Sequence, residues 1–310
     1  MFDVYIAVDW SARGKPSPKK PSKDSVWVGE TAASSVAGAE AQEAYFRTRQ
    51  DGKAYLRERL LLHAYAGRRV LLGLDFAYGY PAGYAQALGL SGTDAPWRRT
   101  WDELARLIED QDNISNRFEV AATLNARCGE NAPGPLWGCP LPQEQPSLKA
   151  TSPSYPYPTG AESALPRLRT SDARQRGVQP VWKLYGNGSV GSQVLVGIPV
   201  VQSLRDDLHL ASFSRAWPFE TGFTSVPTPS EGPFVLHAEI WPGITTALDP
   251  EVAIRDQAQV RAIAALFSRL DAEGTLGELF DRPDGLTADD EAKIVGEEGW
   301  ILGTGLSFSS

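Results

Sequence analysis

Two short apolar segments, each ending in an aspartate, constrain the fold of this 310-residue chain more than any other feature. Residues 4–9 read VYIAVD and residues 69–75 read RVLLGLD, so both have the length and composition of buried strands. Asp9 ends the first segment and Asp75 ends the second. If these strands are parallel neighbours, their carboxyl ends meet at one edge of the sheet, one strand spacing apart. The sequence therefore predicts two carboxylates close together at this edge.

The residues between these two segments indicate how the strands are connected. Strand patterns recur at 25–29 and 43–48, and apolar residues then follow helical spacing across 54–64. Three successive strands can form a meander, and a helix supplies the crossover that a parallel fourth strand requires. The order strand, strand, strand, helix, strand is that of the first half of a ribonuclease-H-like sheet. We therefore expect an α/β protein with a mixed sheet of this type.

The middle of the chain predicts a long insertion within a single domain of residues 1–310. The insertion spans 85–230 and looks helical at 98–127. Proline, glycine, serine and tyrosine are then dense over 128–180, which indicates irregular loops. A loop-rich segment of this length is usually functional or disordered.

Regular patterns return in the later part of the chain. Residues 181–185, VWKLY, look like a strand, and the following apolar residues predict a helix in part, despite Pro199. Another strand is expected at 234–241, and helices at about 250–272 and 287–302 complete the chain.

Composition limits the classes of protein that fit. The net charge of −8 argues against a surface coated for nucleic acid, although local basic contacts remain compatible with it. No apolar run reaches about 18 residues, so we expect no membrane span. The acidic N-terminus lacks the features of a secretory signal, and a cytoplasmic location is expected. In that reducing compartment Cys128 and Cys139 are expected as free thiols, although a disulfide is geometrically possible.

The paired carboxylates of Asp9 and Asp75 suggest a particular chemistry. Two carboxylates at one place repel each other unless a proton or a cation lies between them. Oxygen-rich sites of this kind suit Mg²⁺ or Mn²⁺. Two such ions, about 4 Å apart, are used to hydrolyse phosphodiester bonds. The alternative is that each aspartate only caps the turn that follows it.

Other acids could complete such a site. Glu239 lies inside the apolar segment HAEIWPG, where a lone acid is either paired internally or directed to a site. Asp290 and Glu291 open the last predicted helix, and one carboxylate from this helix would complete a two-metal site. Glu297 and Glu298 are expected to be solvated.

A basic loop follows Asp9 directly. Residues 11–24 read SARGKPSPKKPSKD, and their cations are able to hold substrate phosphates, although a solvated charged loop is an equal alternative. Tryptophans are more often core residues than platforms for stacking bases, and Trp10, beside Asp9, is the one to test as a substrate contact. The expected substrate-binding residues of this region are Trp10, Ser11, Arg13 and Lys15.

The segment GNGSVG at 186–191 formally fits the glycine pattern of dinucleotide-binding proteins. No initial βαβ unit precedes it, and no acid ends a second strand some twenty residues later. A tight turn is the simpler interpretation.

Four short segments of the chain resemble a bacterial family of unknown function whose members are regarded as RNase-H-like nucleases. The segments are AVDWSA at 7–12, GLDFAYGYP at 73–81, AEIWPG at 238–243 and DEAKIVGEEGW at 290–300. The resemblance implies a nuclease with Asp9, Asp75 and Glu239 as metal ligands. It places Lys293 where the family has a late metal-binding acid, so Lys293 either neutralises the site or leaves Asp290, one turn earlier, to reach it.

Three functional hypotheses follow from the sequence. The first is a metal-dependent phosphoryl-transfer enzyme, a nuclease or phosphodiesterase, acting on nucleic acid or a phosphorylated small molecule. Its residues are Asp9, Asp75, Glu239 and Asp290, with Mg²⁺ or Mn²⁺ as the cofactor. The second is an actin- or hexokinase-like nucleotide binder, which needs two duplicated halves. The third is a non-catalytic protein that binds a metabolite or a protein partner.

Overall fold

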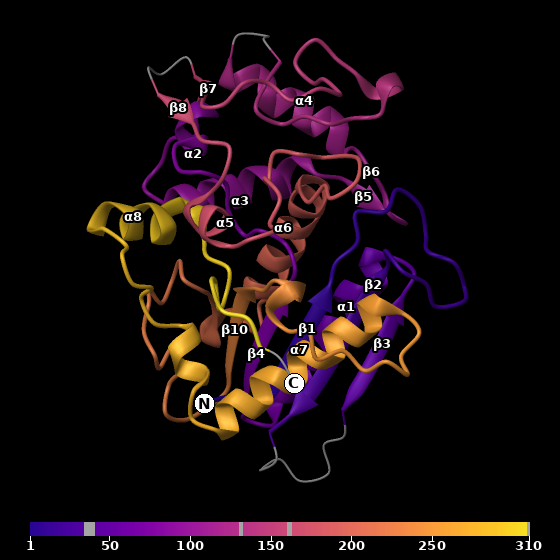
Figure 1. Cartoon of the computed structure of the whole chain (residues 1–310), viewed down its shortest axis with the longest axis vertical. Coiled ribbons are helices and arrows are strands. Elements are labelled where there is room, and N and C mark those ends of the chain that lie inside the picture. Colours follow the sequence, from indigo (N-terminus) through magenta and orange to yellow (C-terminus); the bar gives the residue numbers. More distant parts are fainter. Residues whose placement is uncertain (34–40, 130–132, 160–162, 309–310) are drawn as a thin grey trace.

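The computed structural model describes residues 1–33, 41–129, 133–159 and 163–308. At its centre is a mixed sheet of six strands in the order β3-β2-β1-β4-β10-β9. Figure 1 shows this sheet below a group of helices and loops that belong to the middle of the chain. The strands are β1 (Val4–Asp9), β2 (Val26–Ala32), β3 (Gln42–Phe46), β4 (Arg69–Leu74), β9 (Ser214–Ala216) and β10 (Phe234–Glu239).

The strand directions confirm the predicted order of elements around β1. β2 pairs antiparallel with β1 and with β3, so the first three strands form a meander. Helix α1 (Arg49–Tyr65) then leads to β4, which is parallel to β1 with Val8 opposite Leu74. β10 lies parallel to β4 on its other side, and Glu239 is opposite Leu74. The prediction of an α/β protein with a mixed sheet is therefore confirmed.

Side chains that alternate along β1 enter two separate cores. Ile6 belongs to the core that contains Leu60 of α1, and Ala7 belongs to the core that contains Ile263 of α7 (Arg255–Ala272). Full burial of one aliphatic side chain contributes roughly 1.5–3 kcal/mol, so a strand buried on both faces is held firmly. The carboxyl end of β1 therefore has a well-defined position.

Helix α7 lies directly against the sheet, as Figure 1 shows in orange over β1 and β2. At Gly29 of β2 a Cβ atom would be 2.7 Å from the carbonyl carbon and oxygen of Val260. Because real Cβ atoms do not approach a backbone so closely, residue 29 must be glycine for α7 to lie at this distance.

Helix α1 begins five residues before the predicted position 54. Thr48 is its N-cap, and its hydroxyl oxygen accepts a 3.1 Å hydrogen bond from the main-chain N–H of Asp51. The same hydroxyl donates to the carboxylate of Asp51 at 2.7 Å. This cap satisfies one of the free N–H groups in the first turn, so the helix extends beyond its apolar residues.

The first half of the insertion is helical, as predicted, but it is interrupted. A hairpin separates two helices within the expected helical stretch of 98–127, because Asp112 and Asn113 adopt φ values of 51° and 66°. Aspartate and asparagine tolerate this left-handed conformation better than most residues. The elements are α2 (Tyr84–Ala87), α3 (Pro96–Leu107), β5 (Asp110–Gln111), β6 (Ile114–Ser115) and α4 (Arg117–Cys128).

The proline-rich half of the insertion is irregular and closely packed. Leu136, Leu148 and Leu165 are completely buried, so the described loops of this region contribute to the core that also contains α1. Among the described residues of this region, regular structure is limited to β7 (Tyr157–Pro158), β8 (Ala164–Leu165), α5 (Thr170–Arg174) and a 3₁₀ turn.

One expectation for the later chain is wrong and another is confirmed. Residues 181–185 form a turn instead of a strand, with a single bridge from Lys183 to Trp137. Strand β9 lies inside the predicted insertion and forms an edge of the main sheet. Helix α6 (Gly191–Arg205) forms as expected and continues through Pro199.

The C-terminal region contains less helix than the sequence indicates. The expected helix at 287–302 is divided into α8 (Ala288–Lys293) and a π-helical turn at Ile294–Glu298. Short 3₁₀ turns occur at Leu141–Gln143, Ala211–Phe213, Pro242–Ile244 and Leu276–Leu279.

Two further expectations concern thiols and membranes. Cys128 and Cys139 are both free and buried, as expected, and burial raises the pKa of the Cys128 thiol to about 12. Among the described residues, none of the helices combines the length and the apolar character needed to cross a bilayer.

Candidate functional site

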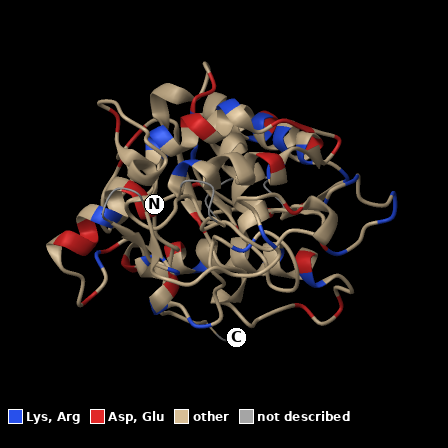
Figure 2. Cartoon of the chain, turned by 90° about the horizontal axis from the view of Figure 1, so that it is seen from above, with Lys and Arg blue, Asp and Glu red and all other residues tan. Residues whose placement is uncertain are grey.

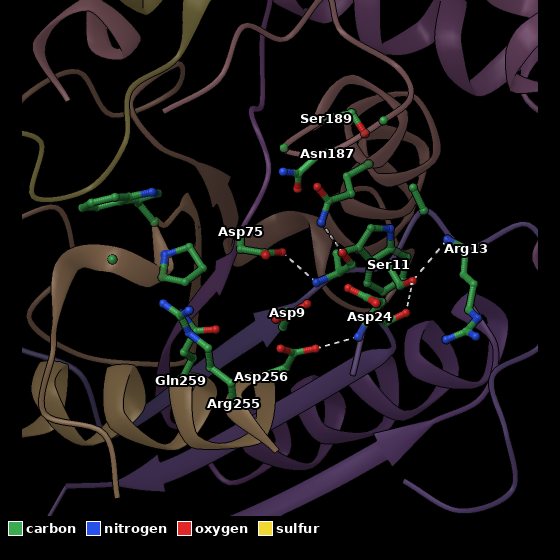
Figure 3. A pocket seen from close by; sticks show the side chains of 18 residues that line it. Asp9, Ser11, Arg13, Asp24, Asp75, Asn187, Ser189, Arg255, Asp256 and Gln259 are labelled. Carbon is green, nitrogen blue, oxygen red and sulfur yellow. Dashed lines mark hydrogen bonds between the residues drawn. The ribbon is translucent and has the colours of Figure 1, made fainter. Parts of the chain in front are cut away.

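Asp9 and Asp75 lie side by side at the carboxyl ends of β1 and β4. The main-chain N–H of Asp75 donates a 3.2 Å hydrogen bond to the carbonyl oxygen of Val8, which continues the parallel ladder by one residue. The main-chain N–H of Trp10 donates a 2.7 Å hydrogen bond to Oδ1 of Asp75. The carboxylate of Asp75 is therefore held against the backbone that directly follows Asp9, as Figure 3 shows.

A cavity of about 650 Å³ opens above these two aspartates. One wall is the end of β1 with the loop after it, and a second wall is the turn that follows β10. Residues 186–189 and the beginning of α7 complete the enclosure. The segment GNGSVG, interpreted as a tight turn, thus also forms part of a cavity wall.

Asp256 and Asp24 bring two more carboxylates to the cavity. Asp256 lies in the first turn of α7, and its Oδ2 accepts a 2.7 Å hydrogen bond from the main-chain N–H of Asp24. Asp24 has a φ of 54°, and its carbonyl oxygen accepts a 2.7 Å hydrogen bond from the hydroxyl of Ser11. Figure 3 shows Asp9 between Asp75 and Asp256, with Asp24 beside them.

The proximity of these acids changes their acidity. Burial, followed by repulsion from Asp75, Asp256 and Asp24, raises the pKa of Asp9 well above its usual value. Burial raises the pKa of Asp75 to about 7, even though the hydrogen bond from the Trp10 N–H favours its charged form. Burial also raises the pKa of Asp256. The cavity therefore holds carboxylates whose charge is costly unless a proton or a cation compensates it.

The donor set of the cavity fits a hard cation better than a soft one. Within the described residues, no group of three or more histidine, cysteine or acidic side chains is close enough to enclose a metal ion. A closed tetrahedral cage of the zinc type is therefore not formed there. Mg²⁺ is commonly held by only one or two carboxylates, with water and substrate phosphates as its other ligands. Asp9 and Asp75 match that arrangement.

Glu239, the third metal ligand implied by the resemblance, has a different environment. Its two carboxylate oxygens accept hydrogen bonds of 2.6 and 2.7 Å from the guanidinium of Arg169, and a 3.2 Å bond from the N–H of Tyr78. Arg169 also binds Asp172, and all three charged side chains are buried. Glu239 does not line the cavity of the two aspartates, and its oxygens are occupied by Arg169.

Asp290 and Lys293 are also outside this cavity. The carboxylate of Asp290 accepts hydrogen bonds from the N–H and the hydroxyl of Thr287, at 3.0 and 2.8 Å, and so caps α8. Lys293 is exposed at the end of the same short helix. The late helix that brings an acid to the cavity is α7, and this acid is Asp256.

The residues expected to bind substrate have different positions. Trp10, Ser11 and Arg13 line the cavity. The ring of Trp10 is fully buried against Phe76, so it offers no surface for stacking. Lys15 is exposed outside the cavity, and only its carbonyl oxygen is engaged, by the side-chain amide of Asn113 at 3.2 Å.

The basic loop that contains Arg13 and Lys15 projects from the molecule. Figure 1 shows it in indigo beyond β2, and in Figure 2 basic residues lie along a loop that projects on the same side. The buried Arg49 fixes the start of this loop, because its Nη1 donates hydrogen bonds of 2.9 Å to the carbonyl oxygens of Ser11 and Arg13. Asp110 of the β5–β6 hairpin forms an ion pair with Arg49.

Sequence reasoning missed two features of the site region. Asp256 carried one usable signal, since it is an acid in the early part of the helix predicted at about 250–272, and it lies in the first turn of α7. Glu297 and Glu298, expected to be solvated, are buried. Glu297 accepts hydrogen bonds from the N–H groups of Gly83 and Ala85 at 2.7 and 2.6 Å, so it fixes the segment after β4.

The described residues thus form an α/β protein with an acidic cavity at the carboxyl ends of two parallel strands. Comparisons of the chain with protein-family models, with curated protein sequences and with solved structures gave no match. The geometry of the cavity is consequently the main basis for assigning a function.

Proposed function

We propose that this chain is a metal-dependent phosphoryl-transfer enzyme of the ribonuclease-H-like type that hydrolyses phosphodiester bonds in nucleic acid. The observation that carries the proposal is the pair Asp9 and Asp75, adjacent at the ends of parallel strands and open to one cavity. Burial raises the pKa of both acids, and repulsion from Asp75 adds to the rise at Asp9, so their charged forms are costly in this position. A divalent cation between them removes this cost.

The arrangement of the sheet supports the ribonuclease-H-like type. A meander of three strands, a crossover helix and a parallel fourth strand beside the first strand are all present. The described residues form one large sheet, and no second copy of this unit occurs among them. An actin- or hexokinase-like protein would need that second unit.

The residues of the cavity have separable roles in the proposed reaction. Bound Mg²⁺ or Mn²⁺ supplies charge stabilisation and makes a water molecule more acidic. Asp9 and Asp75 would hold the cation, and the main-chain N–H of Trp10 orients the carboxylate of Asp75. Asp256, whose pKa is raised, is placed to exchange a proton with water in the cavity. Arg13 and Arg255 provide positive charge for the substrate phosphates.

The test is cleavage of a labelled single-stranded oligonucleotide with Mn²⁺ or Mg²⁺. Wild-type protein should cleave it, and Asp9→Asn and Asp75→Asn should each lower the rate at least about 100-fold. Asp290→Asn is a matched control, because Asp290 is an aspartate outside the cavity, and it should retain the wild-type rate. Metal-independent cleavage, or full activity of Asp75→Asn, would overturn the proposal.

A second candidate function is a non-catalytic protein that binds a phosphorylated metabolite. The engagement of Glu239 by Arg169 favours it, because this pairing leaves fewer free acids near Asp75 than a two-metal nuclease ordinarily has. A metabolite binder would show metal-dependent thermal stabilisation by a phosphorylated compound and no cleavage of any oligonucleotide.

A further inference from the structure

A second, smaller cavity lies behind Asp75. Its volume is about 170 Å³, and it shares four lining residues with the acidic cavity: Asp75, Gly188, Ser189 and Trp241. We call it the side recess. Its lining is largely apolar and comes from the segment after β4, the loop before α6, the end of β10 and the C-terminal segment, including Phe76, Ala77, Val178, Val181, Ile240 and Ile301.

A fixed group of three charged side chains forms one part of the lining of the side recess. Arg169, Asp172 and Glu239 all line it and are nearly completely buried. Arg169 donates to both carboxylates, and Glu239 also accepts from the N–H of Tyr78, so the group is fully hydrogen-bonded. Because these side chains satisfy one another, the recess keeps its shape without a ligand.

Trp241 stands at the boundary between the two cavities and is partly exposed. A Cβ atom at Gly243 would be 2.4 Å from two carbon atoms of its indole ring, so the ring lies directly on the backbone of residue 243. The loop before α6 is also close, since a Cβ atom at Gly177 would be 3.8 Å from the same ring. The backbone of residue 243 therefore fixes the position of the Trp241 ring, and part of the ring remains exposed at the two cavities.

We propose that the side recess holds the base of an unpaired nucleotide whose phosphate lies over Asp9 and Asp75. This inference rests on the proposed function and specifies its substrate as single-stranded or unstacked. Aromatic side chains bind exposed bases by stacking, without a strong preference for sequence. A base inside a duplex cannot reach such a recess unless it leaves the stack.

The volumes of the two cavities support placing the base in the side recess and the phosphate in the acidic cavity. Sites for complete small molecules usually have volumes of about 300–1,000 Å³. The side recess, at about 170 Å³, is too small for a nucleotide and suits a ring alone. The acidic cavity, at about 650 Å³, has room for the sugar and phosphate. The shared residue Asp75 links the expected positions of base and phosphate.

Calorimetric titration in the presence of Mn²⁺ can test the recess with adenosine 5′-monophosphate and ribose 5-phosphate as probes. The nucleotide should bind at least about tenfold more tightly than the sugar phosphate, because only the nucleotide has a base to stack. Trp241→Leu should reduce this ratio to near one. Val178→Phe, which fills the recess from its wall, should do the same, while Trp137→Leu, outside both cavities, should preserve the ratio.

A second set of ligands distinguishes a free nucleotide from a nucleic-acid strand. A short single-stranded oligonucleotide should bind more tightly than the same strand with an abasic site, and Trp241→Leu should remove this difference as well. If only the mononucleotide shows base dependence, the recess serves a free nucleotide and the single-strand substrate is excluded.

Melting curves with Mn²⁺, recorded in parallel, separate the two proposals. A Mn²⁺-dependent shift with equal affinities for the two small probes would overturn the recess and leave the metal site intact. Base-dependent binding without any Mn²⁺ response would support the recess and overturn the metal-dependent function. Melting curves of Trp241→Leu and Val178→Phe also show whether each variant is folded.

Discussion

The main-chain N–H of Trp10 donates a 2.7 Å hydrogen bond to Oδ1 of Asp75, so the residue after the first aspartate orients the second. The bond connects the ends of two strands that are 65 residues apart in the sequence. Since a main-chain donor does not depend on the Trp10 ring, the ring can remain buried while its backbone serves the site. The side-chain carbonyl of an asparagine could accept the same bond, which makes Asp75→Asn a clean test of charge.

Asp75→Asn should stabilise the metal-free protein at pH 8 and abolish its response to Mn²⁺. Burial raises the pKa of Asp75 from 3.8 to about 7, so the folded state retains this proton to a higher pH than the unfolded chain does. The stability that this group contributes is therefore present below about pH 4 and is lost as the pH rises through 7. Melting curves at pH 5 and pH 8, with and without Mn²⁺, measure both effects.

The gain in stability should be larger at pH 8 than at pH 5, because the stability is lost progressively between about pH 4 and pH 7 and only part of that loss has occurred at pH 5. Each kcal/mol corresponds to a shift of roughly 2–4 °C in a protein of this size class. An equal effect of Asp75→Asn at the two pH values would contradict the raised pKa. Asp290→Asn serves again as the control with a carboxylate outside the cavity.

Asp256→Asn should reduce cleavage more than its effect on metal binding explains. Asp256 faces Asp9 from α7 and has a raised pKa, but it is not one of the two strand-end acids. We expect a loss of about 100-fold in kcat, the lower part of the range for general acid–base groups. The pH–rate profile should also lose its acidic limb. If rate and profile both remain those of the wild type, Asp256 has no role in proton transfer.

Glu239→Gln should retain the Mn²⁺ shift, because the carboxylate of Glu239 is bound by Arg169 and lies outside the acidic cavity. Arg169→Met should be far more damaging, since it leaves the buried carboxylates of Asp172 and Glu239 without a positive partner. Breaking a buried ion pair in this way costs about 3–5 kcal/mol. Urea unfolding and Mn²⁺ melting curves test the two variants, and a lost Mn²⁺ shift in Glu239→Gln would restore Glu239 as a ligand.

Glu30→Gln should destabilise the protein at pH 7 by about 1–3 kcal/mol, and by less at pH 3. Burial acts to raise the pKa of Glu30, but hydrogen bonds and charge from His63 and Arg59 outweigh it and hold this pKa at about 2. The unfolded chain takes up the proton near pH 4.5, so wild type loses this stabilisation as the pH falls from there through 2. Urea unfolding at both pH values checks this, and Glu58→Gln, exposed on α1, should have little effect at either.

Arg49→Met should impair substrate binding and leave the Mn²⁺ shift in place. Arg49 holds the carbonyl oxygens of Ser11 and Arg13, so its loss releases one wall of the cavity without removing an acid. Misplacement of such a wall can cost about 10- to 100-fold in kcat/KM, which we expect to arise mainly from KM. Arg57→Met is the matched control on the same helix, because Arg57 forms only a half-exposed ion pair with Asp207.

The sequence was sufficient to predict that the two strand-end acids lie close together, because their positions depend on local patterns. Asp9 and Asp75 each follow an apolar run, and the single helix between them forces the parallel pairing that brings them together. Asp256 could not be placed in this way, since its position depends on how α7 packs across the sheet. Packing angles of this kind arise from many distant contacts and leave no short signature in the sequence.

The role of Glu239 was obscured for a related reason. An acid inside an apolar strand is expected either to be paired or to face a site, and the sequence does not identify the partner. The partner, Arg169, is 70 residues away in a proline-rich segment without regular periodicity. Trp241 was overlooked because tryptophans are usually core residues, which Trp10 is.

The contact between Gly29 and the backbone of Val260 gives the position of α7 a direct chemical consequence. Asp256 lies one turn before Val260, so any side chain at residue 29 that lifts the helix also carries this acid away from Asp9. The absence of a side chain at residue 29 thereby sets the spacing of the carboxylates in the acidic cavity. The strand that carries this glycine contributes no acid to the cavity itself. Residue 29 would then matter for the proposed reaction although it does not line the cavity.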